Sequence, residues 1–302
     1  MLQDWIHNAA AYADLLGRAA GALVKSPWRD HCCERLPARG RVVITGDVHD
    51  NLEHFAAALQ AARLGESPDH HIVLQEIIHG ETLQDGVDMS HRLLARVAEL
   101  VLAHPGQVHP ILANHEIAQA RGHEIEKGGI HCTSAFEAGL DEAFGDDAFE
   151  AAAAVTRFVA AMPLAVVCAN GAVISHSLPS AGAMRHFDLR VLERNLIDED
   201  LDPPFGAAHL MTWGRTHERR QLEELAREWG ARVFIIGHEP APDGVLVREP
   251  NVVILNTGHA YGRVILLELD KPAPTAHALE ESALPIASFL EGPPRGAGEA
   301  LA

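Results

Sequence analysis

Short apolar runs alternate with longer amphipathic stretches in the first part of the chain. Residues 41–45, 71–75 and 108–112 are short and mostly apolar, which is typical of strands that are buried on both faces. Between them, residues 51–64 and 86–103 repeat their apolar positions at helical spacing. This β-α-β-α-β alternation predicts an α/β architecture that is built in layers.

Further elements are predicted before and after this unit. An amphipathic helix is expected over 3–24 and a connector over 26–39. The dipeptide Asn170-Gly171 separates two apolar runs and therefore predicts a β-hairpin. The tail from Glu291 is rich in Gly, Pro and Ala and is expected to be disordered. Helices are also expected over 134–144, 147–161 and 217–229, a loop over 198–206, and strands over 164–168, 172–177, 232–236, 252–255 and 263–267.

Composition narrows the range of partners. The 302 residues carry a formal net charge of −18, which argues against nonspecific binding to nucleic acid or to an anionic membrane. No apolar run approaches the length of a membrane span, and the N-terminus carries Asp4 and no basic stretch, so it does not resemble a signal peptide. The four cysteines include no Cys-x-x-Cys pair, which favours a reduced, cytoplasmic setting.

Potential metal ligands follow five of the predicted strands. Their mixture of carboxylates, imidazoles and one amide suits Mn, Fe or Zn better than Ca or a soft metal. Two such metals can clamp the attacking and leaving oxygens of an in-line displacement. The potential ligands are Asp47 and His49, Glu76 and His79, Asn114 and His115, His176, and His238.

Simpler roles exist for single members of this set. Asp47 could be a helix N-cap, Asn114 and His115 could form a turn, and His176 could be a core histidine at a strand end. The ordered set favours metal ligation over these roles. A carboxylate such as Glu76, which emerges between aliphatic residues, would also be costly to bury without a partner.

The chain resembles the calcineurin-like metallophosphoesterases in four motifs that occur in the family order. These are Gly46-Asp-Val-His, Asn114-His-Glu, Ser175-His176 and Gly237-His238-Glu-Pro. Two further stretches, around Met162-Pro163-Leu164 to Pro179 and around Asn256 to Arg263, look like the serine/threonine phosphoprotein phosphatase branch. The resemblance covers residues 41–267 and implies a four-layer α-β-β-α sandwich of two mixed sheets with flanking helices.

The resemblance also implies a domain organisation and a set of metal ligands. The expected regions are an N-terminal helix and connector (1–40), a metallophosphoesterase domain (41–270) and a partly disordered C-terminal extension (271–302). Two divalent or trivalent ions would be bound, most simply Mn, Fe or Zn. Asp47 and His49 would bind the first, Glu76 would bridge both, and Asn114, His176 and His238 would complete the second site.

Catalytic and substrate-binding roles are implied in the same way. His115 would be the general acid for the leaving alkoxide. Arg215 could hold a phosphate oxygen through its planar fork. His259 and Tyr261 lie in a glycine-rich loop that would border the pocket, although structural roles are an equal alternative for them.

The second motif departs from the family pattern. The family usually has Gly-Asp-x-x-Asp, often followed by Arg-Gly, whereas this chain has Gln75-Glu76-Ile-Ile-His79-Gly80-Glu81. The arginine that binds phosphate in the family is therefore absent from this motif. His79 replaces an aspartate that would orient the general-acid histidine, so it could be an additional metal ligand or could hydrogen-bond His115 or substrate. We expect an additional or outer-shell role at the metals.

The resulting expectation is a binuclear metal-dependent phosphoesterase. A metal-bridging hydroxide would attack phosphorus, and His115 would protonate the leaving group. The expected substrates are phosphomonoesters, such as a phosphorylated protein or a small phosphate ester. The alternatives are a dinucleoside polyphosphate or phosphodiester hydrolase, and a non-catalytic relative that binds metal or a phosphorylated ligand. The altered second motif favours the last of these, but the retained ligands argue against it.

Overall fold

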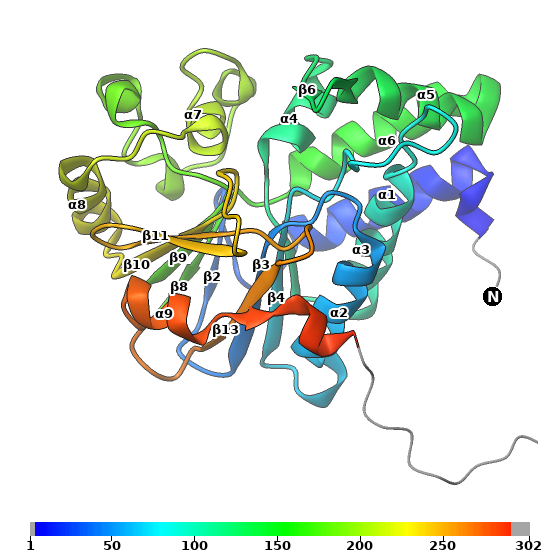
Figure 1. Cartoon of the computed structure of the whole chain (residues 1–302). Coiled ribbons are helices and arrows are strands. Elements are labelled where there is room, and N and C mark those ends of the chain that lie inside the picture. Colours follow the sequence, from blue (N-terminus) through cyan, green and yellow to red (C-terminus); the bar gives the residue numbers. More distant parts are fainter. Residues whose placement is uncertain (1–3, 291–302) are drawn as a thin grey trace, which may run out of the picture.

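Two mixed β-sheets form the centre of the molecule (Figure 1). The structure is a computed structural model and describes residues 4–290. In spatial order, the seven-stranded sheet contains β1 (Arg29–Asp30), β2 (Cys33–Leu36), β8 (Ala165–Cys168), β9 (Ala172–Ser175), β10 (Val233–Ile236), β12 (Val252–Leu255) and β11 (Val245–Arg248). The five-stranded sheet contains β14 (Leu284–Pro285), β13 (Arg263–Glu268), β3 (Arg41–Asp47), β4 (His70–Gln75) and β5 (Val108–Pro110). A separate hairpin consists of β6 (Glu126–Lys127) and β7 (Ile130–His131).

Parallel pairing places several strand ends at one edge of each sheet. In the larger sheet β9, β10 and β12 are parallel neighbours, and in the smaller sheet β3, β4 and β5 are parallel neighbours. Antiparallel strands flank these groups, with β11 beside β12 and β13 beside β3. The parallel strands therefore deliver their carboxyl ends to a common edge, where a ligand site is expected.

Helices cover the outer faces of the sheets. On the smaller sheet, α2 (Leu52–Ala62) packs against β3 and β4, and α3 (His91–Ala103) packs against β5. On the larger sheet, Trp229 of α8 (Arg219–Trp229) meets Phe234 of β10 with ring centroids 6.0 Å apart. The other α-helices are α1 (Ala9–Val24), α4 (Asn114–Arg121), α5 (Cys132–Phe144), α6 (Ala148–Ala161), α7 (Ala207–Trp213) and α9 (Ala276–Ser282). Short 3-10 helices are η1 (Asp4–Ile6), η2 (Leu64–Glu66), η3 (Gly145–Asp147), η4 (Ala181–His186), η5 (Val191–Glu193), η6 (Asp198–Leu201) and η7 (Ile286–Phe289).

Each central strand is buried on both faces. In β10, Val233 and Ile235 join the apolar core between the two sheets, whereas Phe234 and Ile236 join the core beneath the helices. Leu279 of α9 contributes to the core between the sheets. This two-sided burial explains why the strands are continuously apolar in sequence. The predicted fold class, two mixed sheets with flanking helices, is confirmed.

Several predicted boundaries are wrong, and the physical reasons differ. Residues 26–39 are not a simple connector, because β2 lies within them and pairs with β8 in the larger sheet. The helix expected over 86–103 begins only at His91, since residues 84–87 form a turn closed by an isolated bridge between Gln84 and Val87. The hairpin at Asn170-Gly171 is confirmed, with β8 and β9 antiparallel.

The segment before the expected disordered tail is folded. Residues 276–289 form α9, β14 and η7, and η7 packs against α2. The disorder expected from Glu291 onward concerns residues outside the described part of the chain. Among residues 4–290, no helix is both long and apolar enough to span a membrane.

Candidate metal centre

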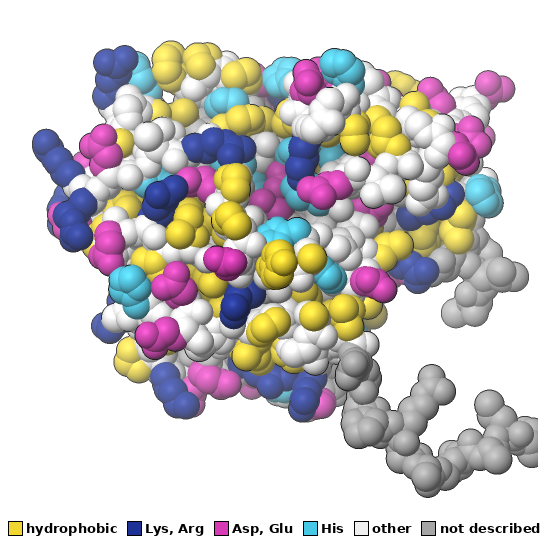
Figure 2. All heavy atoms as spheres, viewed as in Figure 1, with side chains coloured by type: hydrophobic (Ala, Val, Ile, Leu, Met, Phe, Trp, Pro, Cys, Tyr) yellow, Lys and Arg dark blue, Asp and Glu magenta, His cyan; other side chains and the backbone are white. Residues whose placement is uncertain are grey.

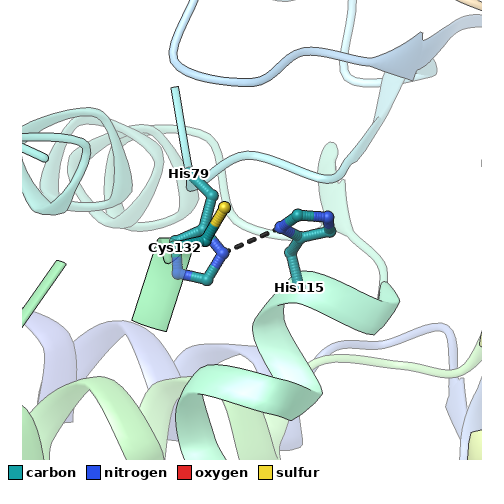
Figure 3. A group of neighbouring side chains, drawn as sticks. All are labelled: His79, His115 and Cys132. Carbon is teal, nitrogen blue, oxygen red and sulfur yellow. Dashed lines mark hydrogen bonds between the residues drawn. The ribbon is translucent and has the colours of Figure 1, made fainter. Parts of the chain in front are cut away.

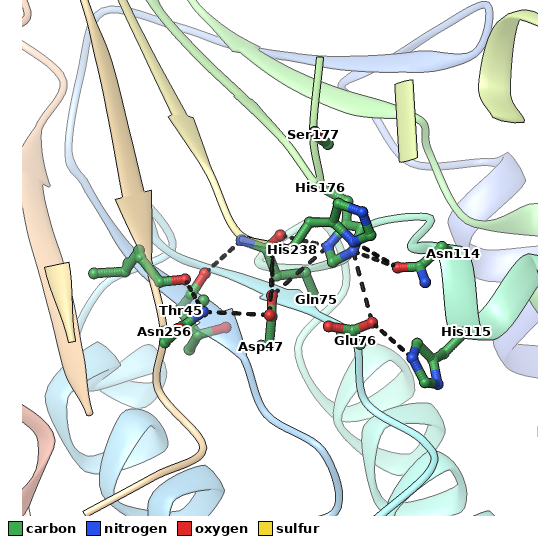
Figure 4. A network of polar contacts seen from close by, with 12 residues as sticks. Thr45, Asp47, Gln75, Glu76, Asn114, His115, His176, Ser177, His238 and Asn256 are labelled. Atoms are coloured by element: carbon green, nitrogen blue, oxygen red, sulfur yellow. Dashed lines mark hydrogen bonds and ion pairs between the residues drawn. The ribbon is translucent and has the colours of Figure 1, made fainter. Parts of the chain in front are cut away.

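The strand ends of the two sheets meet around a cluster of polar side chains (Figure 4). From the smaller sheet come the last residue of β3, the residue after β4 and the first residue of α4. From the larger sheet come the residue after β9 and a residue just beyond β10. These are Asp47, Glu76, Asn114, His176 and His238, respectively.

Sharp backbone turns aim these side chains at one another. Four predicted site residues have left-handed backbone conformations, with φ between 47° and 65°, although none of them is a glycine. Such a conformation costs about 1–2 kcal/mol for an ordinary residue. The concentration of strain at one place is typical of a functional site. The four residues are His49, Glu76, His79 and His238.

Glu76 lies at the centre of the cluster. Its Oε2 is 3.1 Å from His49 Nε2, and its Oε1 is 3.4 Å from His115 Nε2 and 3.7 Å from His176 Nε2. The Glu76 side chain is almost completely buried. One carboxylate thus faces three imidazoles from both sheets.

Asp47 is held in place from the larger sheet. Its two carboxylate oxygens accept the backbone N–H of His238, at 3.0 and 3.2 Å. Asn256, directly after β12, donates its side-chain amide to the same carboxylate at 3.3 Å. These contacts cross between the sheets and fix the orientation of the Asp47 oxygens.

Gln75 orients His176. Gln75 donates its amide N–H to the Thr45 carbonyl at 2.7 Å, so its Oε1 is left to accept a hydrogen bond from the Nδ1–H of His176 at 3.0 Å. His176 must therefore present an unprotonated Nε2, which lies 2.7 Å from Asn114 Oδ1. Two acceptors at this distance repel each other unless a cation or an additional proton lies between them.

Burial sets the protonation states of the cluster. It lowers the pKa of His176 to about 4 and that of His238 to about 2, so both imidazoles are neutral at pH 7. Burial also raises the pKa of Asp47, and the nearby charge of Glu76 raises it further. For Glu76, burial alone would raise the pKa, but the imidazoles of His49 and His176 bring it well below its usual range. For His49, the attraction of Glu76 outweighs burial and raises the pKa to about 9.

The donor set fits two metal ions. Asp47, His49 and Glu76 offer ligand atoms within 4.8 Å of one another, and so do Glu76, His176 and His238, with Glu76 common to both groups. His238 Nε2 is buried and has no hydrogen-bond partner among the described residues. Carboxylates and neutral imidazoles are ligands for Zn, Mn and Fe, and a cation would relieve the repulsion between Asp47 and Glu76.

A pocket of about 590 Å³ opens above the cluster. Figure 2 shows acidic and histidine side chains gathered in this hollow between α7 and the β6 region. Arg215 and His259 line the pocket, whereas Tyr261 is 72% exposed and is not among the lining residues. The ring centroids of His259 and Tyr261 lie 6.5 Å apart, so Tyr261 stands next to the pocket border.

His115 and His79 lie beside the cluster rather than within it. His115 is on α4, and its Nε2 faces Glu76 and the pocket. His79 directs its Nδ1 at His115 Nδ1, 2.8 Å away, and its Nε2 lies 2.9 Å from Gln119 Oε1. Because His115 and Gln119 are one helical turn apart, the same face of α4 holds both ends of the His79 ring.

Three contributors to the site were not predicted. Lys127, on the β6–β7 hairpin, lines the pocket, and its Nζ lies 3.3 Å from Glu81 Oε1. Gln75 orients His176, as described above. Glu116 accepts the backbone N–H groups of Ile77 and Ile78 at 2.7 and 3.2 Å and so holds the loop after β4. The only sequence signal for Glu116 is its place in the Asn-His-Glu motif, and Lys127 has no local signal.

Comparisons with known proteins agree with this geometry. A sequence model described as "Metallophos: Calcineurin-like phosphoesterase" matches residues 40–242. A protein serine/threonine phosphatase from Saccharomyces cerevisiae, with similarity to human phosphatase PP5, is similar in structure with a TM-score of 0.62 and 16% identity, over 85% of this chain and 82% of that chain. The cold-active protein-tyrosine phosphatase of a Shewanella species gives a TM-score of 0.52 and 14% identity, over 82% and 80%. No curated protein matches the chain in sequence.

Proposed function

Since this chain belongs to the calcineurin-like phosphoesterase family, whose members are metal-dependent phosphoric ester hydrolases, we propose that it hydrolyses phosphomonoesters, with phosphorylated proteins as the first substrate class. The observation that carries the proposal is the cluster centred on Glu76 at the floor of an open pocket. The two similar structures, of a protein serine/threonine phosphatase and a protein-tyrosine phosphatase, support the same substrate class.

The metal-binding residues fall into two groups that share Glu76. Asp47, His49 and Glu76 would hold one ion. Asn114, His176 and His238 would hold the other together with Glu76. When bound, the two ions would neutralise phosphate charge and make a water molecule more acidic. Mn, Fe and Zn all suit this donor set.

His115 is proposed as the general acid. Nδ1 of His79 lies 2.8 Å from Nδ1 of this ring, and Gln119 Oε1 holds the opposite nitrogen of His79 at 2.9 Å. This arrangement aims Nε2 of His115 at the pocket, where it would donate a proton to the leaving oxygen as the P–O bond breaks. His79 thereby acts through His115, as a positioning residue.

Two cationic side chains would bind the phosphate. Arg215 and Lys127 are the only Arg or Lys among the described residues that line the pocket. Lys127 would thus supply positive charge that the second sequence motif lacks. Of the two loop residues, His259 is proposed to contact substrate from the pocket wall and Tyr261 from just outside it.

The charge of the pocket favours monoesters over polyphosphates. Four glutamates line it in addition to the metal cluster, and they would repel the several phosphates of a dinucleoside polyphosphate. These are Glu81, Glu124, Glu126 and Glu239.

We also propose a cytoplasmic location. All four cysteines are buried free thiols, and they make no disulfide within the described part of the chain. This state is typical of proteins in a reducing compartment.

The test combines metal content with two kinds of substrate. The purified protein is loaded with Mn²⁺, its metal content is measured, and hydrolysis of p-nitrophenyl phosphate, bis(p-nitrophenyl) phosphate and a phosphoserine peptide is followed. Two metals per chain with activity on the monoester and the peptide are expected. Two bound metals without activity on any of the three would overturn the proposal, and activity on the diester alone would favour a phosphodiesterase.

A test of His115 as the general acid needs a substrate with a poor leaving group. We expect His115→Ala to lose far more activity on an alkyl phosphate than on p-nitrophenyl phosphate, because nitrophenolate leaves without a proton. Asp47→Asn should lose activity on both, since it removes a metal ligand. Equal losses on both esters in His115→Ala would refute the assignment.

A further inference from the structure

Figure 3 shows a second group of potential ligands, formed by His79, His115 and Cys132. It lies directly beside the Glu76 cluster, because His115 Nε2 is 3.4 Å from Glu76 Oε1. His79, His115 and Cys132 each offer one ligand atom, and these three atoms all lie within 4.8 Å of one another. The three residues are 1%, 6% and 3% exposed. They come from the loop after β4, from α4 and from the first residue of α5, so three separate segments converge here.

In both imidazoles, of His79 and of His115, the proton is on Nε2 and points away from the other ring. His79 Nε2 faces Gln119 Oε1 at 2.9 Å, and a carbonyl oxygen can only accept, so the proton of His79 is on Nε2. His115 Nε2 faces Glu76 Oε1 at 3.4 Å, and an ionised carboxylate also only accepts. Both neutral rings therefore carry a lone pair on Nδ1, and these two atoms lie 2.8 Å apart.

Two opposed lone pairs at this distance repel each other unless a cation lies between them. A metal ion is favoured by the third donor, the thiol of Cys132. The far nitrogens of both rings are also held by oxygen acceptors, as is usual for histidines that bind metals.

We propose that His79, His115 and Cys132 form a third metal site that takes a thiophilic divalent cation such as Zn²⁺. Each ligand donates one electron pair, the Cys132 thiol loses its proton to solvent, and the fourth position stays open for water. In the metal-free protein the thiol is protonated, since burial and the nearby Asp88 raise the pKa of Cys132. Its Sγ then donates to the Ile130 carbonyl at 3.6 Å.

Occupation of this site would switch off His115. A cation on Nδ1 occupies the lone pair of that nitrogen and pins the ring, so His115 can no longer take up a second proton and act as an imidazolium acid that returns to a neutral ring after it donates from Nε2. Zn²⁺ in excess would therefore inhibit an enzyme loaded with Mn²⁺. This inhibition rests on the proposed function, whereas the existence of the site does not.

Sulfur gives the site its own spectroscopic signal. None of the proposed ligands of the two-metal cluster contains sulfur, so a thiolate-to-cobalt charge-transfer band in the near ultraviolet can come only from a cysteine ligand. We expect metal-free protein titrated with Co²⁺ to bind a third equivalent together with this band. Cys132→Ser should lose both, while Cys168→Ser, which changes a buried thiol between the two sheets, should keep both.

Two further variants test whether loss of the cobalt band reflects loss of a metal ligand. Cys132→Ala tests whether the loss depends on the particular replacement, and circular dichroism with thermal melting checks that each variant is folded. His79→Gln keeps the thiol but removes a nitrogen ligand, so its band should require a higher Co²⁺ concentration, by about tenfold or more. The absence of the band in folded wild-type protein, or an unchanged band in both Cys132 variants, would overturn the site.

Activity measurements test whether metal at the third site inhibits the enzyme, separately from whether the site exists. With Mn²⁺ present, Zn²⁺ should inhibit the wild-type protein at a concentration at least about tenfold lower than it inhibits Cys132→Ser. Basal Mn²⁺ activity should be the same in both proteins. If the cobalt band depends on Cys132 but Zn²⁺ inhibits both proteins equally, the site stands and its effect on His115 is wrong.

Discussion

Replacing Gln75 by leucine should weaken metal binding at His176 although Gln75 touches no metal. Leucine has a similar size but removes two buried contacts, the one with the Thr45 carbonyl at 2.7 Å and the one with His176 Nδ1 at 3.0 Å. Each such bond contributes about 1 kcal/mol, and the stranded imidazole N–H adds about 1–3 kcal/mol. We therefore expect the free energy of unfolding to fall by about 3–5 kcal/mol.

The effect on metal affinity follows from the orientation of one ring. Without the Gln75 acceptor, His176 can place its proton on Nε2, which faces Asn114 and Glu76. Loss of such an outer partner typically lowers metal affinity by about 10- to 100-fold. Calorimetric titration of metal-free protein with Mn²⁺ would measure this change, and urea unfolding would measure the loss of stability.

Gln107→Leu is the matched control. Gln107 donates its amide to the carbonyls of Leu64, Ser67 and His70, at the other end of the same sheet. It should lower the free energy of unfolding by a similar amount and leave metal affinity unchanged. Equal metal affinity in Gln75→Leu and wild type, or equal losses in both variants, would refute the reasoning.

The remaining predictions concern metal removal, pH and substrate charge. A chelator should lower the melting temperature, because ligand at 100 times its Kd stabilises the fold by about 2.7 kcal/mol; thermal melting with and without chelator checks this, and an unchanged melting temperature would argue against bound metal. His49 is protonated below about pH 9 by its pairing with Glu76, so metal affinity should rise about tenfold per pH unit from pH 7 and level off above about pH 9. The same raised pKa means that this pair stabilises the metal-free fold fully below pH 6.5 and loses its contribution, about 3 kcal/mol, as pH rises through about 9; a metal-free stability that does not fall across this window would contradict it. Lys127→Ala should raise KM about tenfold with little change in kcat, and Lys127→Arg should restore KM; equal effects of both variants would exclude a charge role.

The sequence was sufficient to predict that the central candidate ligands lie close together. Consecutive parallel strands present their carboxyl ends at one edge, so Asp47, Glu76 and Asn114 could be expected together without knowing the fold in detail. The two histidines from the other sheet were placed by the family resemblance, because nothing local shows that β9 and β10 end opposite β3 and β4. Their ligand roles stay predictions until metal is measured.

Contacts between distant segments could not be predicted in this way. Gln75 and His176 are 101 positions apart, and the role of the glutamine depends entirely on that contact. Strand β2 was missed for a related reason, since its four residues pair with β8, more than a hundred residues later. Lys127 reaches the pocket only because the hairpin of β6 and β7, over residues 126–131, holds it there.

The side chains of the cluster around Glu76 come from both sheets, so a metal bound there would connect the two sheets. Asp47 and Glu76 belong to one sheet, whereas His176 and His238 belong to the other. A chain in which only one sheet has formed can offer no more than half of this ligand set, so tight metal binding begins only when the sheets have docked. The rate of metal uptake during refolding would therefore report when the two sheets dock. On heating, the temperature at which metal is released would report when the two sheets first separate.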